Sequence, residues 1–354
     1  MDHKHLLEKL LTDVIKEGGS DLHLSDGRRP MIRVNGELIP LSTYEVFDEK
    51  TMAGVLGVMV SSEFKKEFEA KKELDFSYAF KTEGRFRGNA FVQQGRVGVV
   101  MRLISNVLRS ISELGLPPIL ETFARHKQGF FLVVGPVGQG KSTTLAAMIE
   151  LINRERAEHI ITIENPIEYI YKPQKSIIDQ REVRIDTEDF DKALLGTFRQ
   201  DVDVILVGEM RGKDTIAAAV TAAETGHLVF STLHTNNASQ TIDRIIDSFP
   251  GDQQDQIRVQ LSGSLIGIFS QRLIPRISGG MIPAYELLIN NNAVANLIRE
   301  KRTYEIDTVI ETGSEHGMID MNRTLADLVR RGEITPENAY IHSFRPEMLE
   351  RLIK

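Results

Sequence analysis

The segment from Gly135 to Ser142, with the sequence GPVGQGKS, has the residue types and spacing of a phosphate-binding loop. Its glycines allow consecutive backbone N–H groups to point at a phosphate, where side chains would obstruct them. Lys141 adds a positive charge for the β- and γ-phosphates, and the hydroxyl of Ser142 is a ligand for Mg²⁺. The segment therefore predicts a site for ATP and Mg²⁺. We expect the following residues to contact the nucleotide: Gly135, Pro136, Gly138, Gln139, Gly140, Lys141, Ser142 and Thr143.

The residues on either side of this segment predict the strand and the helix that a phosphate-binding loop needs. Residues 130–134 form an apolar run directly before the loop, and residues 142–152 are apolar at helical spacing. The phosphates would then lie at a helix N-terminus, where the backbone dipoles favour anions. The alternative is a flexible glycine turn that matches by chance, and the flanking elements argue against it.

Polar residues flank three further apolar runs, at residues 160–163, 204–207 and 228–232. These runs alternate with helical patterns, which is typical of a largely parallel sheet with helices on both faces. Ligands of such sheets bind beyond the carboxyl ends of the strands, so that edge is where we expect the chemistry. The candidate side chains near these runs are Glu164, Glu168, Glu209, His227 and His234.

Phosphoryl transfer needs Mg²⁺, a carboxylate that orients and deprotonates the attacking water, and cations for the equatorial oxygens. The residue pattern alone leaves Glu164, Glu168 and Glu209 open as the base. Glu164 is equally consistent with a capped turn, whereas Glu209, which closely follows the four apolar residues 204–207, is hard to explain as a cap. A lone histidine is more often structural, but two that bracket one strand favour a role at the nucleotide.

The first hundred residues predict a separate, smaller domain. Residues 6–17 form an amphipathic helix, and Asn35-Gly36 is typical of a hairpin turn. Residues 74–80 and 86–92 alternate as two strands joined at Glu83-Gly84, which indicates an α+β domain on an antiparallel sheet. Glycine, serine and proline then interrupt the periodicity. We therefore predict a first domain at 1–104, a linker at 105–114 and a second domain at 115–354.

The composition excludes several classes of protein. The 354 residues are 41% hydrophobic, which is enough for two cores. The chain has no cysteine, which excludes disulfides, thiolate zinc sites and cysteine nucleophiles. No run approaches the roughly 20 apolar residues of a membrane span, so we expect no direct membrane insertion. The net charge of −7 argues against nucleic acid as the partner, because such binding depends on Lys and Arg.

These motifs together carry a resemblance to a known family. Residues 135–144, 164–169, 208–211 and 225–236 resemble the Walker A motif, Asp box, Walker B motif and His box of the secretion ATPase superfamily. Within it they are most similar to the PilT-like retraction ATPases of type IV pili. The resemblance covers nearly the whole chain. It implies an α/β fold, with an N-terminal PAS-like α+β domain followed by a C-terminal RecA-like P-loop ATPase domain.

The resemblance also implies how the protein works. It predicts a cytoplasmic homo-hexamer with nucleotide between its subunits, which couples ATP hydrolysis to pilus retraction and twitching motility. Its expected partner is the inner-membrane platform protein of the pilus machine, through which it would lie at the membrane periphery. A paralogous motor ATPase is a second candidate partner, and no nucleic acid is expected.

The resemblance assigns roles to individual residues. Glu168 matches the catalytic glutamate, and Glu209 matches the Walker B carboxylate on the metal side, partly through water. His227 and His234 match the His-box pair, which the family uses near the γ-phosphate and in interdomain contact. Arg85 and Arg87 match two arginines of the family's N-terminal domain, which reach toward the nucleotide. Alternate residues of a strand share a face, so both could approach one ligand, and the alternative is a solvated strand face.

The chain departs from the family at four positions. Asn165 replaces an Asp, Val202 replaces a Pro, Gly212 replaces an Asp, and Ala295 replaces the first Arg of an A-I-R-N-L-I-R motif near the C-terminus. The hydrolytic residues remain, so the departures bear on coupling, and they leave open an accessory paralogue of the main motor. The motifs are also compatible with a pilus-assembly or type II secretion ATPase, a motor on nucleic acid, and a nucleotide-gated scaffold.

Overall fold

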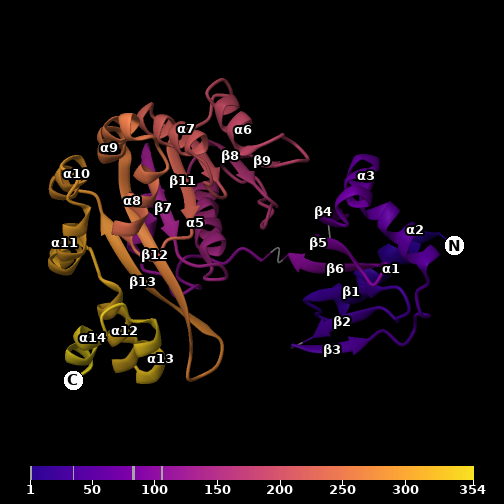
Figure 1. Cartoon of the computed structure of the whole chain (residues 1–354). Coiled ribbons are helices and arrows are strands. Elements are labelled where there is room, and N and C mark those ends of the chain that lie inside the picture. The colour runs from indigo at the N-terminus through magenta and orange to yellow at the C-terminus, as the bar shows by residue number, and fades with distance from the viewer. Residues whose placement is uncertain (1, 35, 82–83, 105–106) are drawn as a thin grey trace. The chain divides into compact units, whose positions relative to one another are not determined.

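The computed structural model describes residues 2–34, 36–81, 84–104 and 107–354. The chain forms two compact units, Met1–Val107 and Leu108–Lys354, each built around its own sheet (Figure 1). Some of the sequence predictions fall outside the described residues. They concern the turn residues Asn35 and Glu83, and residues 105–106 of the predicted linker.

The first unit is an α+β domain. Its six-stranded sheet has the order β3-β2-β1-β6-β5-β4, and every neighbouring pair is antiparallel. An antiparallel sheet with one buried face agrees with the strict alternation in the sequence. The elements are α1 (His3–Lys16), β1 (Asp21–Ser25), β2 (Met31–Val34), β3 (Glu37–Pro40), α2 (Glu49–Met59), α3 (Ser62–Lys71), β4 (Glu73–Phe80), β5 (Gly84–Gln93) and β6 (Arg96–Ile104).

Helix α1 covers one face of this sheet with its apolar side. Asp2 begins the helix as its N-cap, because the carboxylate accepts hydrogen bonds from the backbone N–H groups of Lys4 and His5. The buried face of the helix joins strand residues such as Leu22 and Phe86 in one core. Residues on the opposite face of the strands are left outside this core, which is where Arg85 and Arg87 lie.

The second unit is a mixed α/β domain. Its seven-stranded sheet has the order β13-β12-β7-β11-β10-β8-β9, parallel throughout except for the antiparallel edge strand β13. The strands are β7 (Gly129–Val134), β8 (His159–Glu164), β9 (Ile177–Glu182), β10 (Val204–Val207), β11 (Leu228–Leu233), β12 (Leu265–Pro275) and β13 (Met281–Ile289).

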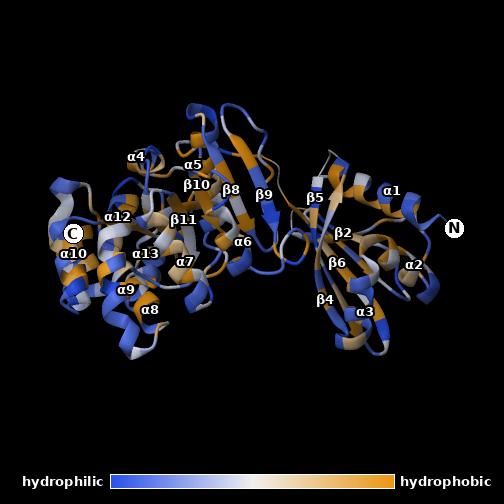
Figure 2. Cartoon of the chain, turned by 90° about the horizontal axis from the view of Figure 1, so that it is seen from above, coloured by the Kyte–Doolittle hydropathy of each residue, from blue (hydrophilic) through white to orange (hydrophobic). Residues whose placement is uncertain are grey.

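The helices of this unit cover both faces of the sheet. Alternate residues of β7 enter two different cores, with Phe130 and Leu132 in one and Phe131 and Val133 in the other. This confirms the parallel sheet that the continuous apolar runs predicted, and Figure 2 shows β8 and β10 as mainly hydrophobic strands. The helices are α4 (Ile119–Ala124), α5 (Lys141–Glu155), α6 (Phe190–Thr197), α7 (Lys213–Glu224), α8 (Ala238–Asp247), α9 (Gly251–Ser264), α10 (Asn292–Arg299), α11 (Ile306–Thr312), α12 (Met321–Arg330), α13 (Pro336–His342) and α14 (Pro346–Ile353).

The last three helices pack around a small core of their own. Leu325 of α12 and Leu349 of α14 are fully buried there, together with Ile274 near the end of β12. Strand β12 therefore runs from its pairing with β7 out to the C-terminal helices (Figure 1). Across the described residues, no helix combines the length and the apolar character needed to cross a membrane.

Candidate nucleotide-binding and hydrolysis site

The phosphate loop joins the buried strand β7 to helix α5. All six residues of the strand are buried, and Lys141 begins the helix. Gly138 and Gly140 both have φ near +78°, a backbone conformation that residues with a side chain rarely adopt. At Gly135, whose φ is +148°, a Cβ atom would lie 2.5 Å from the carbonyl oxygen of Gln271. The loop therefore requires glycine at these positions.

Lys141 lies inside the loop with only 7% of its surface exposed. Its ammonium group donates to the carbonyl oxygens of Gly135 at 2.8 Å and Pro136 at 2.9 Å. Burial is the main cause that lowers the pKa of Lys141 to about 8; the charge of Glu168 opposes this effect and that of Arg272 adds to it. A bound phosphate would favour the charged form, so the site is prepared for an anion.

His234 lies beside this lysine, directly after β11. Its Nδ1 atom is 3.2 Å from the Nζ atom of Lys141, and its Nε2 atom is 3.7 Å from a carboxylate oxygen of Glu209. The pKa of His234 is lowered, first by burial and then by the charges of Lys141 and Arg211. A neutral ring accepts from the ammonium at Nδ1, which leaves the Nε2 proton facing Glu209.

Glu209 follows β10 at the same edge of the sheet. Its carboxylate contacts the guanidinium of Arg211, and its side chain is 25% exposed. The structure thus brings Lys141, His234 and Glu209 together from three neighbouring parallel strands. Mg²⁺ prefers hard oxygen ligands, and the hydroxyl of Ser142 and the carboxylate of Glu209 are groups of that kind.

The Asp box separates its two carboxylates into different environments. Glu164, the last residue of β8, is 8% exposed and accepts a hydrogen bond of 2.7 Å from the hydroxyl of Thr162. It also accepts from the backbone N–H of Glu168 at 3.3 Å, so it caps the turn, which is one of the two roles that the sequence left open for it. Burial raises the pKa of Glu164 to about 7, although the hydrogen bonds from Thr162, the backbone of Glu168 and Gln180 act in the opposite direction.

Glu168 is half-buried and close enough to Lys141 to raise the pKa of that lysine. The next residue, Tyr169, holds this turn against the first turn of α5, because its hydroxyl lies 2.8 Å from the hydroxyl of Thr143. Of the two Asp-box carboxylates, Glu168 is therefore the one that solvent and a phosphate can reach.

His227 is not brought to the phosphate loop of its own chain. It precedes β11, and its carbonyl accepts from Gly129, the first residue of β7, whereas the loop follows the last residue of that strand. Because β11 has six residues, the two ends are separated by roughly 20 Å. The ring of His227 instead bonds the carbonyl of Ala222 at 2.9 Å and meets Phe198 edge-on. Within a single chain the two imidazoles therefore lie at opposite ends of β11, as their spacing predicted, and a role of His227 at a nucleotide stays a prediction.

Arg85 and Arg87 lie on one face of β5, as their spacing predicted. Phe86 between them is fully buried in the core of the first unit, so the two guanidinium groups lie on the opposite face. Arg85 donates to the hydroxyl of Ser77 at 3.1 Å, and Arg87 is exposed beside Arg102 of β6. Their approach to a nucleotide stays a prediction.

A pocket of about 400 Å³ adjoins the phosphate loop, and sequence reasoning missed it. Gly140, Thr143 and Thr144 form one wall, and residues 112–116 together with Pro283 form another. Pockets of this size and mixed polarity hold small ligands, so this one suits the base and ribose of a nucleotide. Residues 108–114, predicted as linker, are part of the second unit. The apolar residues around Leu114 and Leu116 were the signal for this.

Gln271 of β12 was also missed, although it ties the loop to the sheet. It is 2% exposed, donates to the carbonyl of Gln139 at 2.7 Å and accepts from the hydroxyl of Thr144 at 2.6 Å. The backbone of Leu273 donates to the side chain of Gln139 at 2.7 Å. These contacts fix the loop from the outside, and no local pattern in the sequence could reveal them.

The chain matches a protein family described as "Type II/IV secretion system protein" over residues 3–303. It belongs to this family. Two similar proteins come from Pseudomonas aeruginosa. The chain is 42% identical to the "Type IV pilus retractation ATPase PilT" over 341 residues, covering 96% of this chain and 99% of that protein. It is 41% identical to the "Type IV pilus ATPase PilU" over 348 residues, covering 98% of this chain and 91% of that protein.

A solved structure shares the fold over almost the full length. It is the crystal structure of the pilus retraction motor PilT with bound ADP, with a TM-score of 0.90 and 44% identity. The match covers 97% of this chain and 98% of that one. The α/β architecture with an N-terminal domain and a C-terminal P-loop ATPase domain is therefore that of the family.

Proposed function

We propose that the chain is an ATPase motor that couples ATP hydrolysis to the retraction of a type IV pilus. The proposal rests on one observation about the site. Four side chains lie close together at one edge of a parallel sheet, beside a nucleotide-sized pocket: Lys141, Glu168, Glu209 and His234. The likeness to PilT over nearly the whole length of both chains supports retraction as the output.

Each residue of this site has a defined part in hydrolysis. Lys141 and the loop N–H groups bind the β- and γ-phosphates. Glu168 accepts a proton from the water whose oxygen attacks the γ-phosphorus, while the bond to the bridging oxygen breaks and ADP leaves. Ser142 and Glu209 would hold Mg²⁺, the latter through water, and the ion would neutralise phosphate charge. His234 connects Lys141 to Glu209 and so responds to the γ-phosphate.

The remaining assigned residues require a neighbouring subunit or domain. Arg85 and Arg87 belong to the first unit. His227 lies at the amino end of β11, whereas the phosphate loop of the same chain lies at the carboxyl end of the neighbouring β7. A homo-hexameric ring with nucleotide at its subunit boundaries would give all three a place at the site. We further propose that the ring works in the cytoplasm, docked on the inner-membrane platform protein of the pilus machine, and without nucleic acid.

A second candidate is an accessory motor that works beside a main retraction ATPase. Two observations support the accessory motor. The chain is nearly as identical to PilU as it is to PilT, and Ala295 of α10 replaces the first Arg of the C-terminal motif. A type II secretion or pilus-assembly ATPase is less consistent with the chain, because those proteins usually carry a tetracysteine module and this chain has no cysteine.

Complementation tests the proposal and separates the two candidates. The chain would be expressed in a piliated strain that lacks its main retraction ATPase, and in a strain that lacks only the accessory paralogue. We expect restored twitching in the first strain, and no rescue by Lys141→Ala. Rescue of the second strain alone would assign the accessory role. Rescue of neither, by a protein that hydrolyses ATP and forms rings, would overturn retraction as the function.

A further inference from the structure

A buried arginine joins strand β12 to the loop that follows β11, beside the phosphate site. Arg272 follows Gln271 on β12 and is 6% exposed. Its Nη1 atom donates to the carbonyl of Gln271 at 2.9 Å, and its Nη2 atom donates to the side-chain oxygen of Asn236 at 2.9 Å and to the carbonyl of that residue at 3.2 Å. These acceptors are neutral oxygens, so the fork of the guanidinium holds backbone segments in place.

Both segments that Arg272 holds contact the nucleotide site directly. The carbonyl of Gln271 is the atom that a Cβ on Gly135 would strike, so it sets the closest approach of the phosphate loop to β12. Asn236 lies two residues after His234, which contacts Lys141. A phosphate that draws Lys141 from its carbonyl partners also changes what His234 contacts. The loop 234–236 is therefore where a nucleotide-dependent shift would reach Arg272.

The other side of Arg272 faces the C-terminal segment between α13 and α14. The carbon of its guanidinium lies 5.4 Å from the centre of the Phe344 ring, which is a cation–π distance. Phe344 is 45% exposed, so its ring is not part of a core. A contact of this kind contributes to the position of the segment without being needed for the fold.

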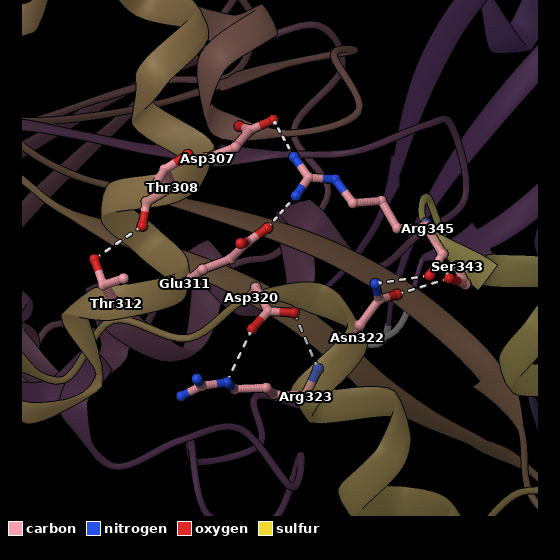
Figure 3. A network of polar contacts seen from close by, with 9 residues as sticks. All are labelled: Asp307, Thr308, Glu311, Thr312, Asp320, Asn322, Arg323, Ser343 and Arg345. Atoms are coloured by element: carbon pink, nitrogen blue, oxygen red, sulfur yellow. Dashed lines mark hydrogen bonds and ion pairs between the residues drawn. The ribbon is translucent and has the colours of Figure 1, made fainter. Parts of the chain in front are cut away.

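Neighbouring residues hold this segment in a defined place. Arg345 forms ion pairs with Asp307 and Glu311 of α11, as Figure 3 shows. Asn322 of α12 donates to the carbonyl of Arg345 at 3.2 Å and accepts from the hydroxyl of Ser343 at 2.7 Å. Helix α14 begins directly after Arg345. A displacement of Phe344 would therefore be passed to α11, α12 and α14 together.

We propose that Arg272 is a positioning residue that couples the nucleotide state of the phosphate site to the C-terminal helices, through Asn236 on one side and Phe344 on the other. The inference rests on the proposed ATPase function and adds to it a route from the site to the end of the chain. A ligand shifts such an equilibrium only through contacts that differ between its states, and the 234–236 loop provides that difference.

Hydrogen exchange of α14 in the full-length protein tests this route. Exchange would be compared with ADP and with a non-hydrolysable ATP analogue, in wild type and in Phe344→Leu, which removes the ring at a half-exposed site. We expect a difference in wild type of roughly two- to fivefold, the range of a partly exposed cation–π contact. We expect that difference to vanish in Phe344→Leu and to return in Phe344→Tyr. Ile341→Ser, at a side chain that is 76% exposed in the same region, is the matched control and should behave as wild type.

Kinetics of the same variants separate coupling from a merely structural role. We expect Phe344→Leu to lower kcat for ATP with an unchanged KM, and Phe344→Tyr to recover it. Arg272→Lys, which keeps the charge but loses the fork, should lose the nucleotide-dependent difference in exchange as well. A difference that persists in Phe344→Leu, or that is absent from wild type, would overturn the proposal. Failure of ATP hydrolysis in wild type would instead refute the proposed function, because the exchange comparison needs only binding.

Discussion

Gln271→Met removes the contacts between the phosphate loop and β12 while keeping the length of the side chain. The hydroxyl of Thr144, 1% exposed, loses its acceptor, and the carbonyl of Gln139 loses a donor. The Thr144 hydroxyl, left buried without a partner, costs about 1–3 kcal/mol, whereas the half-buried carbonyl of Gln139 can bond water instead. The free energy of unfolding of the second unit should therefore fall by about 1–3 kcal/mol. The loop must also be ordered when ATP binds. If the variant orders the loop without one hydrogen bond worth about 1.4 kcal/mol, it binds ATP about tenfold more weakly than wild type does.

Calorimetric titration with ATP and thermal unfolding would measure the two effects separately. Val137→Ala is the matched control, because Val137 belongs to the same loop and its side chain is 79% exposed. We expect this control to bind and unfold as wild type does. If Gln271→Met bound ATP with wild-type affinity, the reasoning that β12 orders the phosphate loop would be wrong.

Three further predictions concern charge. Glu286 lies on β13 and, like Glu164, is buried. Burial raises the pKa of each carboxyl from 4.5 to about 7. Each therefore contributes stability that is complete below the pKa of the unfolded state and is lost as pH rises through the pKa of the folded state. Denaturation followed by circular dichroism should show a loss of roughly 3 kcal/mol per group between about pH 5 and pH 8, reduced in Glu286→Gln, and a flat profile would contradict the burial argument. Arg85→Ala and Arg87→Ala should slow turnover by about 10³-fold or more with ATP binding kept, and recovery on mixing with Lys141→Ala chains would show supply between subunits. Asn165→Asp should change the Mg²⁺ dependence of turnover more than it changes ring assembly, and an unaltered dependence would make that departure neutral.

The parts of the fold that the sequence predicted well are those set by local patterns. The buried strand β7, the glycines of the loop and the start of α5 follow each other within about 15 residues, so turn chemistry and periodicity alone define them. The amphipathic face of α1 is local in the same sense. The antiparallel and parallel sheets could be distinguished because one face is buried in the first and both faces in the second.

The parts that escaped prediction depend on contacts between distant segments. Gln271 meets the loop across more than a hundred residues of sequence, and its amide has no neighbours that mark it as a site residue. Residues 112–114 were predicted as part of the linker, yet together with Gly115 and Leu116 they form a pocket wall. The positions of His227 and His234 at opposite ends of one strand were predicted from the sequence, but the contacts of His227 with Ala222 and Phe198 were not.

The central claim is that Glu168 is the water-activating carboxylate, and turnover in two matched variants of the purified full-length protein tests it most directly. ATP hydrolysis and ATP binding would be measured for Glu168→Gln and for Glu164→Gln. The account predicts that Glu168→Gln binds ATP and does not hydrolyse it. It predicts that Glu164→Gln retains turnover, because that carboxyl is only 8% exposed and is engaged in capping the turn. Near wild-type hydrolysis by Glu168→Gln, together with its loss in Glu164→Gln, would contradict the assignment.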